Sequence, residues 1–199
     1  NISGGSNTIT GGAGVDTVSL TGGTTTFTGG TGADKITMSG GTNTITGGTS
    51  GLDVFNITGG ASNTITTVGA DTMTITGGTN NQITSGAGGS NITISNTSTN
   101  TITGGTSGLD IITASAGTNT IKGGVGADTI NISGGSNTIT GGSGVDTVSL
   151  TGGTTTFTGG TGADKITLSG GINTITGGTS GLDVFNITGG ASNTITTVG

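Results

Sequence analysis

Every acidic residue of this chain is an aspartate, and all of them occupy one position of one repeating pattern. Each follows a glycine by two positions, as in Gly32-Ala33-Asp34, and consecutive aspartates are mostly 18 or 19 residues apart. The exception is the longer interval from Asp71 to Asp110, where we expect Asn91 to take the middle position. Carboxylates at a fixed spacing can bind a hard cation or accept repeated hydrogen bonds. They are Asp16, Asp34, Asp53, Asp71, Asp110, Asp128, Asp146, Asp164 and Asp183.

The composition limits what can position these carboxylates. Glycine accounts for 48 of 199 residues and charged residues for 6%, which alone would favour disorder. However, proline is absent, and the Ile, Val, Leu and Phe residues keep a fixed phase to the Gly-Gly pairs. The sequence therefore predicts a narrow, repetitive core rather than a globular interior.

Several functional classes are disfavoured. The chain has no His, Cys, Glu, Arg or Tyr, so it lacks the usual general bases, triads and disulfides, and we expect no enzyme. The one stretch that breaks the repeat, 91–100, contains nothing catalytic. A net charge of -6 with three lysines makes nucleic acid a poor partner. No 18-residue apolar run and no signal segment are visible, so we expect no transmembrane segment.

The sequence repeats at two levels. Residues 131–199 reproduce residues 1–69 with three changes, and the offset of 130 residues holds seven short repeats of about 18.6 residues. We expect a single continuous domain over 1–199, forming part of a longer array, with no capping element visible at either end.

Each short repeat consists of two halves, and each half is a glycine turn followed by β-branched residues at a period of two. Asp34, Ile36 and Met38 share one parity and should face inward, as should Asn43 and Ile45 of the next half. This pattern predicts an all-β fold, a right-handed parallel β-solenoid of about 11 coils, with 18–20 residues and two strands per coil. At about 4.8 Å per coil, the rod would be roughly 50 Å long.

In such a solenoid the aspartates form a column. Neighbouring carboxylates about 5 Å apart repel by about 0.9 kcal/mol in bulk water, and by more in a turn of lower dielectric. Calcium would remove this repulsion, because it binds carboxylate and carbonyl oxygens that glycine turns allow to converge. The alternative is an Asx-turn, in which the side chain accepts a backbone hydrogen bond from two residues on.

The motif of residues 29–37, Gly-Gly-Thr-Gly-Ala-Asp-Lys-Ile-Thr, resembles the nonapeptide of repeats-in-toxin (RTX) proteins, G-G-x-G-x-D-x-U-x. Residues 11–19, 123–131, 141–149 and 159–167 match equally well. The resemblance implies a parallel β-roll with calcium held between successive loops by the aspartates and by loop carbonyls, such as those of 29–32. The glycines implied as ligands are Gly12, Gly14, Gly30, Gly32, Gly124, Gly126, Gly142, Gly144, Gly160 and Gly162.

Three departures from the RTX pattern narrow this expectation. The alternate half of each repeat carries Asn in place of Asp, so calcium should line one edge only. Loops 47–53, 104–110 and 177–183 have one extra residue, and the loop at Asn91 lacks a carboxylate, so ligation is in doubt in these four coils. On the opposite edge we expect an asparagine ladder of structural role. It comprises Asn7, Asn43, Asn63, Asn81, Asn100, Asn119, Asn137, Asn173 and Asn193, with Thr25 and Thr155 as substitutes.

Outward Thr-x-Thr triplets, such as Thr44-Ile45-Thr46, recur on the Asn-bearing half and are interrupted at 82–84 and 120–122. They are similar to the ice-binding face of β-solenoid antifreeze proteins, although threonine is also simply a good outward strand residue. The rows are equally suited to pack against another rod or to carry O-linked sugars.

Together these features predict a secreted or cell-surface bacterial protein, a structural rod in a filament, surface layer or adhesin stalk that calcium stiffens. The expected partners are calcium ions and identical repeats packed end to end or side by side, with ice and surface glycans as alternatives.

Overall fold

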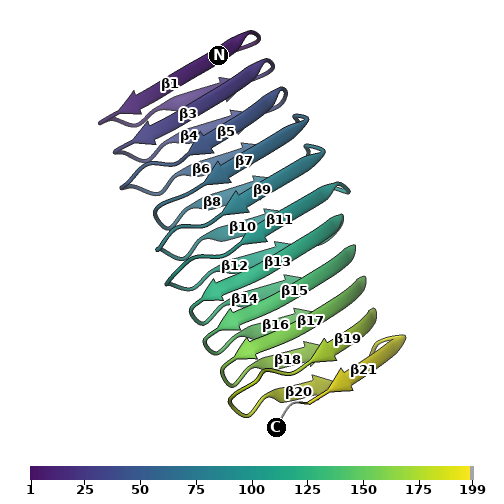
Figure 1. Ribbon diagram of the computed structural model, residues 1–199. Coiled ribbons are helices and arrows are strands. Elements are labelled where there is room, and N and C mark those ends of the chain that lie inside the picture. Colours follow the sequence, from purple (N-terminus) through teal and green to yellow (C-terminus); the bar gives the residue numbers. More distant parts are fainter. Residues whose placement is uncertain (198–199) are drawn as a thin grey trace.

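The computed structural model describes residues 1–197 and shows among them 21 β-strands and no helix. The strands alternate between two parallel sheets as the chain winds, so that each coil gives one strand to each sheet (Figure 1). The 11-stranded sheet contains β1 (Ser6–Gly12), β3 (Thr24–Gly30), β5 (Thr42–Thr46), β7 (Ser62–Thr66), β9 (Asn80–Thr84), β11 (Thr99–Thr103), β13 (Thr118–Val125), β15 (Ser136–Ser143), β17 (Thr154–Thr161), β19 (Ile172–Thr176) and β21 (Ser192–Thr196). The 10-stranded sheet contains β2 (Thr17–Leu20), β4 (Lys35–Met38), β6 (Val54–Ile57), β8 (Thr72–Ile75), β10 (Asn91–Ile94), β12 (Ile111–Ala114), β14 (Thr129–Ile132), β16 (Thr147–Leu150), β18 (Lys165–Leu168) and β20 (Val184–Ile187).

The pairing register places equivalent residues of successive coils directly over one another. Ile45 pairs with Ile65 in one sheet, and Ile36 pairs with Phe55 in the other. All strand pairs are parallel, and the chain advances one complete coil between partners. The predicted parallel β-solenoid of about 11 coils is confirmed.

Most interior coils bury five side chains between the two sheets, and three coils bury a sixth, which is Thr67, Ser85 or Asn96. In one coil the five are Asp34, Ile36, Met38, Asn43 and Ile45, each no more than 1% exposed. Three apolar side chains thus lie in the middle and one polar side chain lies at each edge. The alternation of inward and outward residues is the one expected of strands at a period of two. The narrow core therefore has a polar row along each side.

Glycine is required where the loops of successive coils stack. Gly32 has φ of 143°, a conformation that L side chains rarely adopt. A Cβ at this residue would also collide with the carbonyl of Gly14 in the preceding coil. The loops that present the aspartates therefore approach one another backbone to backbone.

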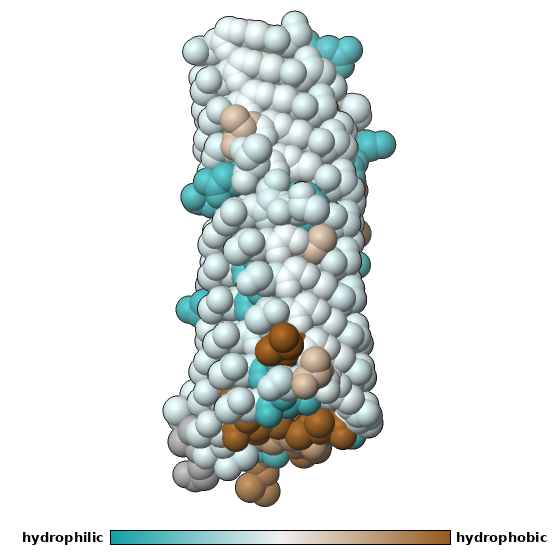
Figure 2. All heavy atoms as spheres, turned by 90° about the vertical axis from the view of Figure 1, so that its right-hand side faces the viewer, coloured by the Kyte–Doolittle hydropathy of each residue, from teal (hydrophilic) through white to brown (hydrophobic). Residues whose placement is uncertain are grey.

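The edge formed by the turns that lead into the 11-stranded sheet faces the viewer in Figure 2. Most of this face is of intermediate hydropathy, and apolar side chains gather only at the end that carries the C-terminus. In the last described coil Ile187 is 51% exposed, whereas its register partner Leu168 is fully buried. The core side chains of this coil are uncovered because no described coil packs against them.

Candidate metal centre along the aspartate edge

The nine aspartates stack along the edge where each loop enters the 10-stranded sheet. Asp34 directly precedes β4, and Asp146 directly precedes β16. Seven of the nine are no more than 2% exposed, and Asp16 and Asp183, in the terminal coils, are partly buried. We call this column, together with Ser90, the aspartate seam.

Asn91 is not part of this column, contrary to the sequence prediction. Asn91 is exposed and pairs with Thr72 and Ile111, each of which follows an aspartate. Ser90 is buried and takes the place of the carboxylate, because its N–H donates to Oδ1 of Asp110. The prediction was wrong by one residue, because Asn91 was matched by its amide chemistry and not by the strand register.

One oxygen of each carboxylate takes part in a ladder between coils. The backbone N–H of Asp34 donates to Oδ1 of Asp53 at 2.8 Å, and that of Asp146 donates to Oδ1 of Asp164 at 2.9 Å. The same bond joins every neighbouring pair of aspartates on either side of Ser90. An Asx-turn would take its hydrogen bond from within the same loop, so this ladder is a different arrangement.

The second carboxylate oxygen has no hydrogen-bond partner in six coils of the described chain, although it is buried. Burying an ionised oxygen without a partner is unfavourable, so this atom calls for a compensating positive charge. The six unpartnered oxygens are Oδ2 of Asp16, Asp34, Asp71, Asp128, Asp146 and Asp164.

The first glycine of the loop leaves space beside this oxygen. A Cβ added to Gly141 would lie 2.5 Å from Oδ2 of Asp146 and would also collide with the carbonyl oxygen of Gly159 in the next coil. Equivalent positions are Gly11, between Asp16 and the carbonyl of Gly29, and Gly123. A carboxylate oxygen and a carbonyl oxygen thus converge on a space that glycine keeps empty.

This donor set fits calcium. The ion takes six to eight hard oxygen ligands at about 2.3–2.6 Å, commonly from carboxylates, backbone carbonyls and water. Among the described residues no three His, Cys, Asp or Glu side chains come together, so most protein ligands would have to be carbonyls. A bound calcium would supply the positive charge that the buried carboxylates lack.

The predicted glycine ligands differ in what their carbonyls do. Those of Gly12, Gly30 and Gly160 accept hydrogen bonds of 2.7 Å from the next coil. Those of Gly124 and Gly142 are directed at the equivalent glycine of the next coil. The glycines at the fourth position of the motif also direct their carbonyls at the next loop; they are Gly14, Gly32, Gly126, Gly144 and Gly162. The prediction named the glycines at the second and fourth positions, together with loop carbonyls such as those of 29–32, and the structure directs the carbonyl of the first glycine, such as Gly29, toward the space beside a carboxylate.

The environment shifts the acidity of the interior aspartates. The pKa of Asp146 is raised from 3.8 to about 6, mainly because burial removes water from the carboxylate. The charges of Asp164 and Asp128 raise this pKa too, while the N–H bond from Asp128 lowers it. Burial also raises the pKa of Asp71, Asp128 and Asp164. The ionised seam is therefore under electrostatic strain when no cation is bound.

The opposite edge has no such strain over most of its length. Nδ2 of each asparagine donates to Oδ1 of the asparagine in the next coil, at 2.8–2.9 Å, and in most coils also to a carbonyl of its own turn. The ladder runs from Asn43 to Asn137 and again from Asn173 to Asn193, with breaks at the buried Thr25 and Thr155. The predicted asparagine ladder is confirmed.

A family model describes the same repeats. It is the RTX calcium-binding nonapeptide repeat (4 copies), and it matches well over half of the chain, in residues 3–26, 19–50, 104–138, 133–157 and 158–180. The chain belongs to the RTX calcium-binding repeat family. No curated protein and no solved structure matches it.

Repeats of the RTX family bind calcium, and β-solenoids of this type are typically non-catalytic. The RTX matches leave out residues 51–103. In this segment Thr67 and Ser85 replace the first glycine of the loop, and Ser90 replaces the aspartate. No helix that is long and apolar enough to cross a membrane occurs among the described residues.

Proposed function

We propose that this RTX chain is a non-enzymatic structural rod of a bacterial extracellular filament, surface layer or adhesin stalk, and that calcium along the aspartate seam stiffens it. The observation that carries the proposal is the row of buried, unpartnered Oδ2 oxygens, three of which converge with carbonyls of the next coil. Without a cation these carboxylates oppose the stacking of the coils. With calcium they hold neighbouring coils together, so that metal binding contributes directly to folding.

Circular dichroism and thermal unfolding in calcium chloride and in excess chelator test the proposal. We expect chelation to lower the melting temperature or to abolish the β signal, and added calcium to restore it. Magnesium at the same concentration is the control, because its smaller, octahedral coordination suits this carbonyl-rich site less well. An unchanged β signal and melting temperature after removal of calcium would refute the calcium-dependent rod.

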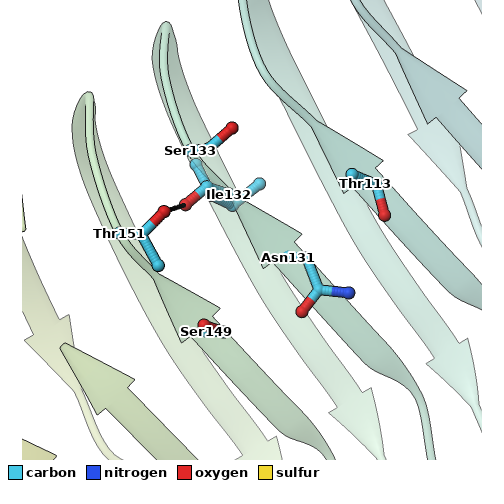
Figure 3. Close-up of a pocket in the computed structure, with 6 residues that line it drawn as sticks. All are labelled: Thr113, Asn131, Ile132, Ser133, Ser149 and Thr151. Atoms are coloured by element: carbon cyan, nitrogen blue, oxygen red, sulfur yellow. Dashed lines mark hydrogen bonds between the residues drawn. The ribbon is translucent and has the colours of Figure 1, made fainter. Parts of the chain in front are cut away.

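A non-enzymatic role is supported by what lines the surface. A shallow groove of about 110 Å³ lies on the outer face of the 10-stranded sheet, between Thr113, Asn131, Ser149 and Thr151 (Figure 3). The Thr151 hydroxyl donates to the carbonyl of Ile132, and the lining residues include no acid, base or thiol. The groove therefore offers hydroxyl and amide groups for packing or hydration but no general acid or base.

End-to-end association of identical rods is a further part of the proposal. The uncovered Ile187 and the unpaired strands of the last described coil suit a further coil of the same kind or the end of a second rod. We expect concentration-dependent lengthening of the purified chain in calcium, observed by electron microscopy. Short particles of one size at every concentration would count against end-to-end packing.

Ice binding is a second candidate, favoured by one observation. The outward threonines of the 11-stranded sheet are stacked in two straight rows, as in the pairing of Thr44 with Thr64 and of Thr46 with Thr66. Gln82 and Lys122 interrupt these rows. Measurement of thermal hysteresis on the purified chain tests this function. Absence of hysteresis, with ice crystals of unaltered shape, would exclude it.

A further inference from the structure

Three aspartates of the seam do satisfy their second oxygen, and they do so without a metal. Oδ2 accepts the backbone N–H of the glycine five residues earlier: Gly48 for Asp53 at 2.7 Å, and Gly105 for Asp110 at 2.6 Å. The third pair is Gly178 and Asp183, also at 2.7 Å. These are the three loops with one extra residue. We call Asp53, Asp110 and Asp183 the latched aspartates.

The extra residue explains why the N–H is free to turn inward. In loops of normal length that begin with Gly-Gly the strand continues through the second glycine, as in β15, where Gly142 pairs with Gly124 and Gly160. Before each longer loop the strand ends sooner, at the threonine preceding the first glycine. The second glycine then leaves the sheet ladder, and its N–H points at the carboxylate.

The longer loop also changes the site of the coil before it. A Cβ at Gly29 would meet Oδ2 of Asp34 at 2.6 Å and the nitrogen of Gly48 at 2.9 Å. The same holds at Gly159, where the nitrogen of Gly178 lies 2.8 Å away. A normal loop presents a carbonyl oxygen at this place. An N–H carries a positive partial charge, so it stabilises the carboxylate but repels a cation.

We propose that the one-residue insertion replaces calcium by a main-chain N–H, so that the latched aspartates bind no calcium and the coil before each latch loses a ligand. This inference rests on the proposed calcium function and adds which coils use the metal. Complete sites, with an unpartnered Oδ2 and a facing carbonyl, then remain in three coils. They are those of Asp16, Asp128 and Asp146. The metal-free coils keep the rod connected between the calcium-dependent ones.

Deletion of Ser107 is the sharpest test, because it shortens residues 104–110 to the motif Gly-Gly-Thr-Gly-Leu-Asp. Gly104 already faces the carbonyl of Gly123, and its Cβ would lie 2.8 Å from Oδ2 of Asp110. Calcium chloride is titrated into the chelator-treated 199-residue chain, and the bound ions are counted by calorimetry. We expect the deletion variant to bind one ion more than the parent chain. Ser107→Ala is the matched control, since it removes the hydroxyl but keeps the loop length, and it should bind as many ions as the parent.

Two further variants keep the test decisive if the shortened loop folds poorly. Asp110→Asn should leave the number of bound ions unchanged, whereas Asp146→Asn should reduce it by at least one. Loss of an ion from Asp110→Asn, or no gain in a folded deletion variant, would overturn the latch and leave the calcium rod intact. If the parent chain binds no calcium at all, the proposed function itself is wrong, and the inference is wrong with it.

Discussion

Filling the space beside one carboxylate should remove one calcium site and strain the coil. Gly141 is not at positive φ, so Gly141→Ala is permitted by the backbone, but the new Cβ would lie 2.5 Å from Oδ2 of Asp146. Overpacking of this kind costs about 1–3 kcal/mol. Loss of one site costs about 2.7 kcal/mol more at free calcium near 100 times the dissociation constant. For a chain of this size, about 1 kcal/mol corresponds to about 2–4 °C in melting temperature.

The strain is present with or without metal, whereas the calcium contribution is present only with metal. Melting curves of parent and Gly141→Ala, each in calcium and in chelator, therefore separate the two effects. We expect the difference between the proteins to be about 5–10 °C larger in calcium. Gly4→Ala is the control, because Gly4 lies in the turn of Asn7 on the opposite edge and its Cβ would meet nothing within 4 Å. Equal differences in calcium and in chelator would show that the space is not a metal site.

Three further predictions follow from the two edges. The pKa of Asp146 is raised in the folded state, so the metal-free chain should lose about 2 kcal/mol of unfolding free energy as the pH rises from about 4 through 6, after allowance for solvent screening. In calcium the trend should reverse, since the ion binds only the ionised carboxylate, and urea unfolding at several pH values shows either sign. Asn100→Ala removes the acceptor of one Asn81 N–H, the donor to Oδ1 of Asn119 and the side-chain partner of the buried Asn96, and it should cost about 2–4 kcal/mol equally in calcium and in chelator, measured by the same unfolding. Thr155→Asn should stabilise the chain by about 1 kcal/mol by giving Oδ1 of Asn173 a donor, and a lower melting temperature would show that the Phe157 ring leaves no room for the amide.

The sequence was sufficient to predict the coil because its glycine, aspartate, asparagine and apolar residues all recur with the same period. Asp34, Ile36 and Met38 share a parity that only a strand with one buried face can produce, and the structure buries all three. The position of Ser90 could not be obtained in this way. Serine is common in outward positions of this chain, and only the strand register identifies Ser90 as the serine that takes the aspartate position.

The latches were beyond sequence reasoning for a different reason. The extra residue in loop 104–110 is visible, and it made ligation by Asp110 doubtful. The group that replaces the metal is the N–H of Gly105. This N–H is free to bond the carboxylate only because β11 ends at Thr103 and Gly105 lies outside the sheet. Hydrogen bonding of a single backbone group is decided by stacking against the next coil. A pattern of residue types does not specify that contact.

The two edges of the rod differ in the charge of the atom that meets the neighbouring turn. On the asparagine edge Nδ2 of Asn119 donates to a carbonyl of its own turn and Oδ1 accepts from Asn100, so the row is satisfied by itself. On the aspartate edge Oδ1 of Asp146 accepts a backbone N–H from Asp128, but Oδ2 shares the space beside Gly141 with the carbonyl oxygen of Gly159 and has no donor. An amide nitrogen at this place would donate to that carbonyl. Asp146→Asn should therefore be more stable than the parent in chelator and less stable than the parent in calcium, because an ionised carboxylate has no proton to donate to the carbonyl, whereas a cation can bind both oxygens. A metal-dependent edge requires the order of stability of parent and Asp146→Asn to reverse between chelator and calcium. A purely structural aspartate would give the same order in both conditions.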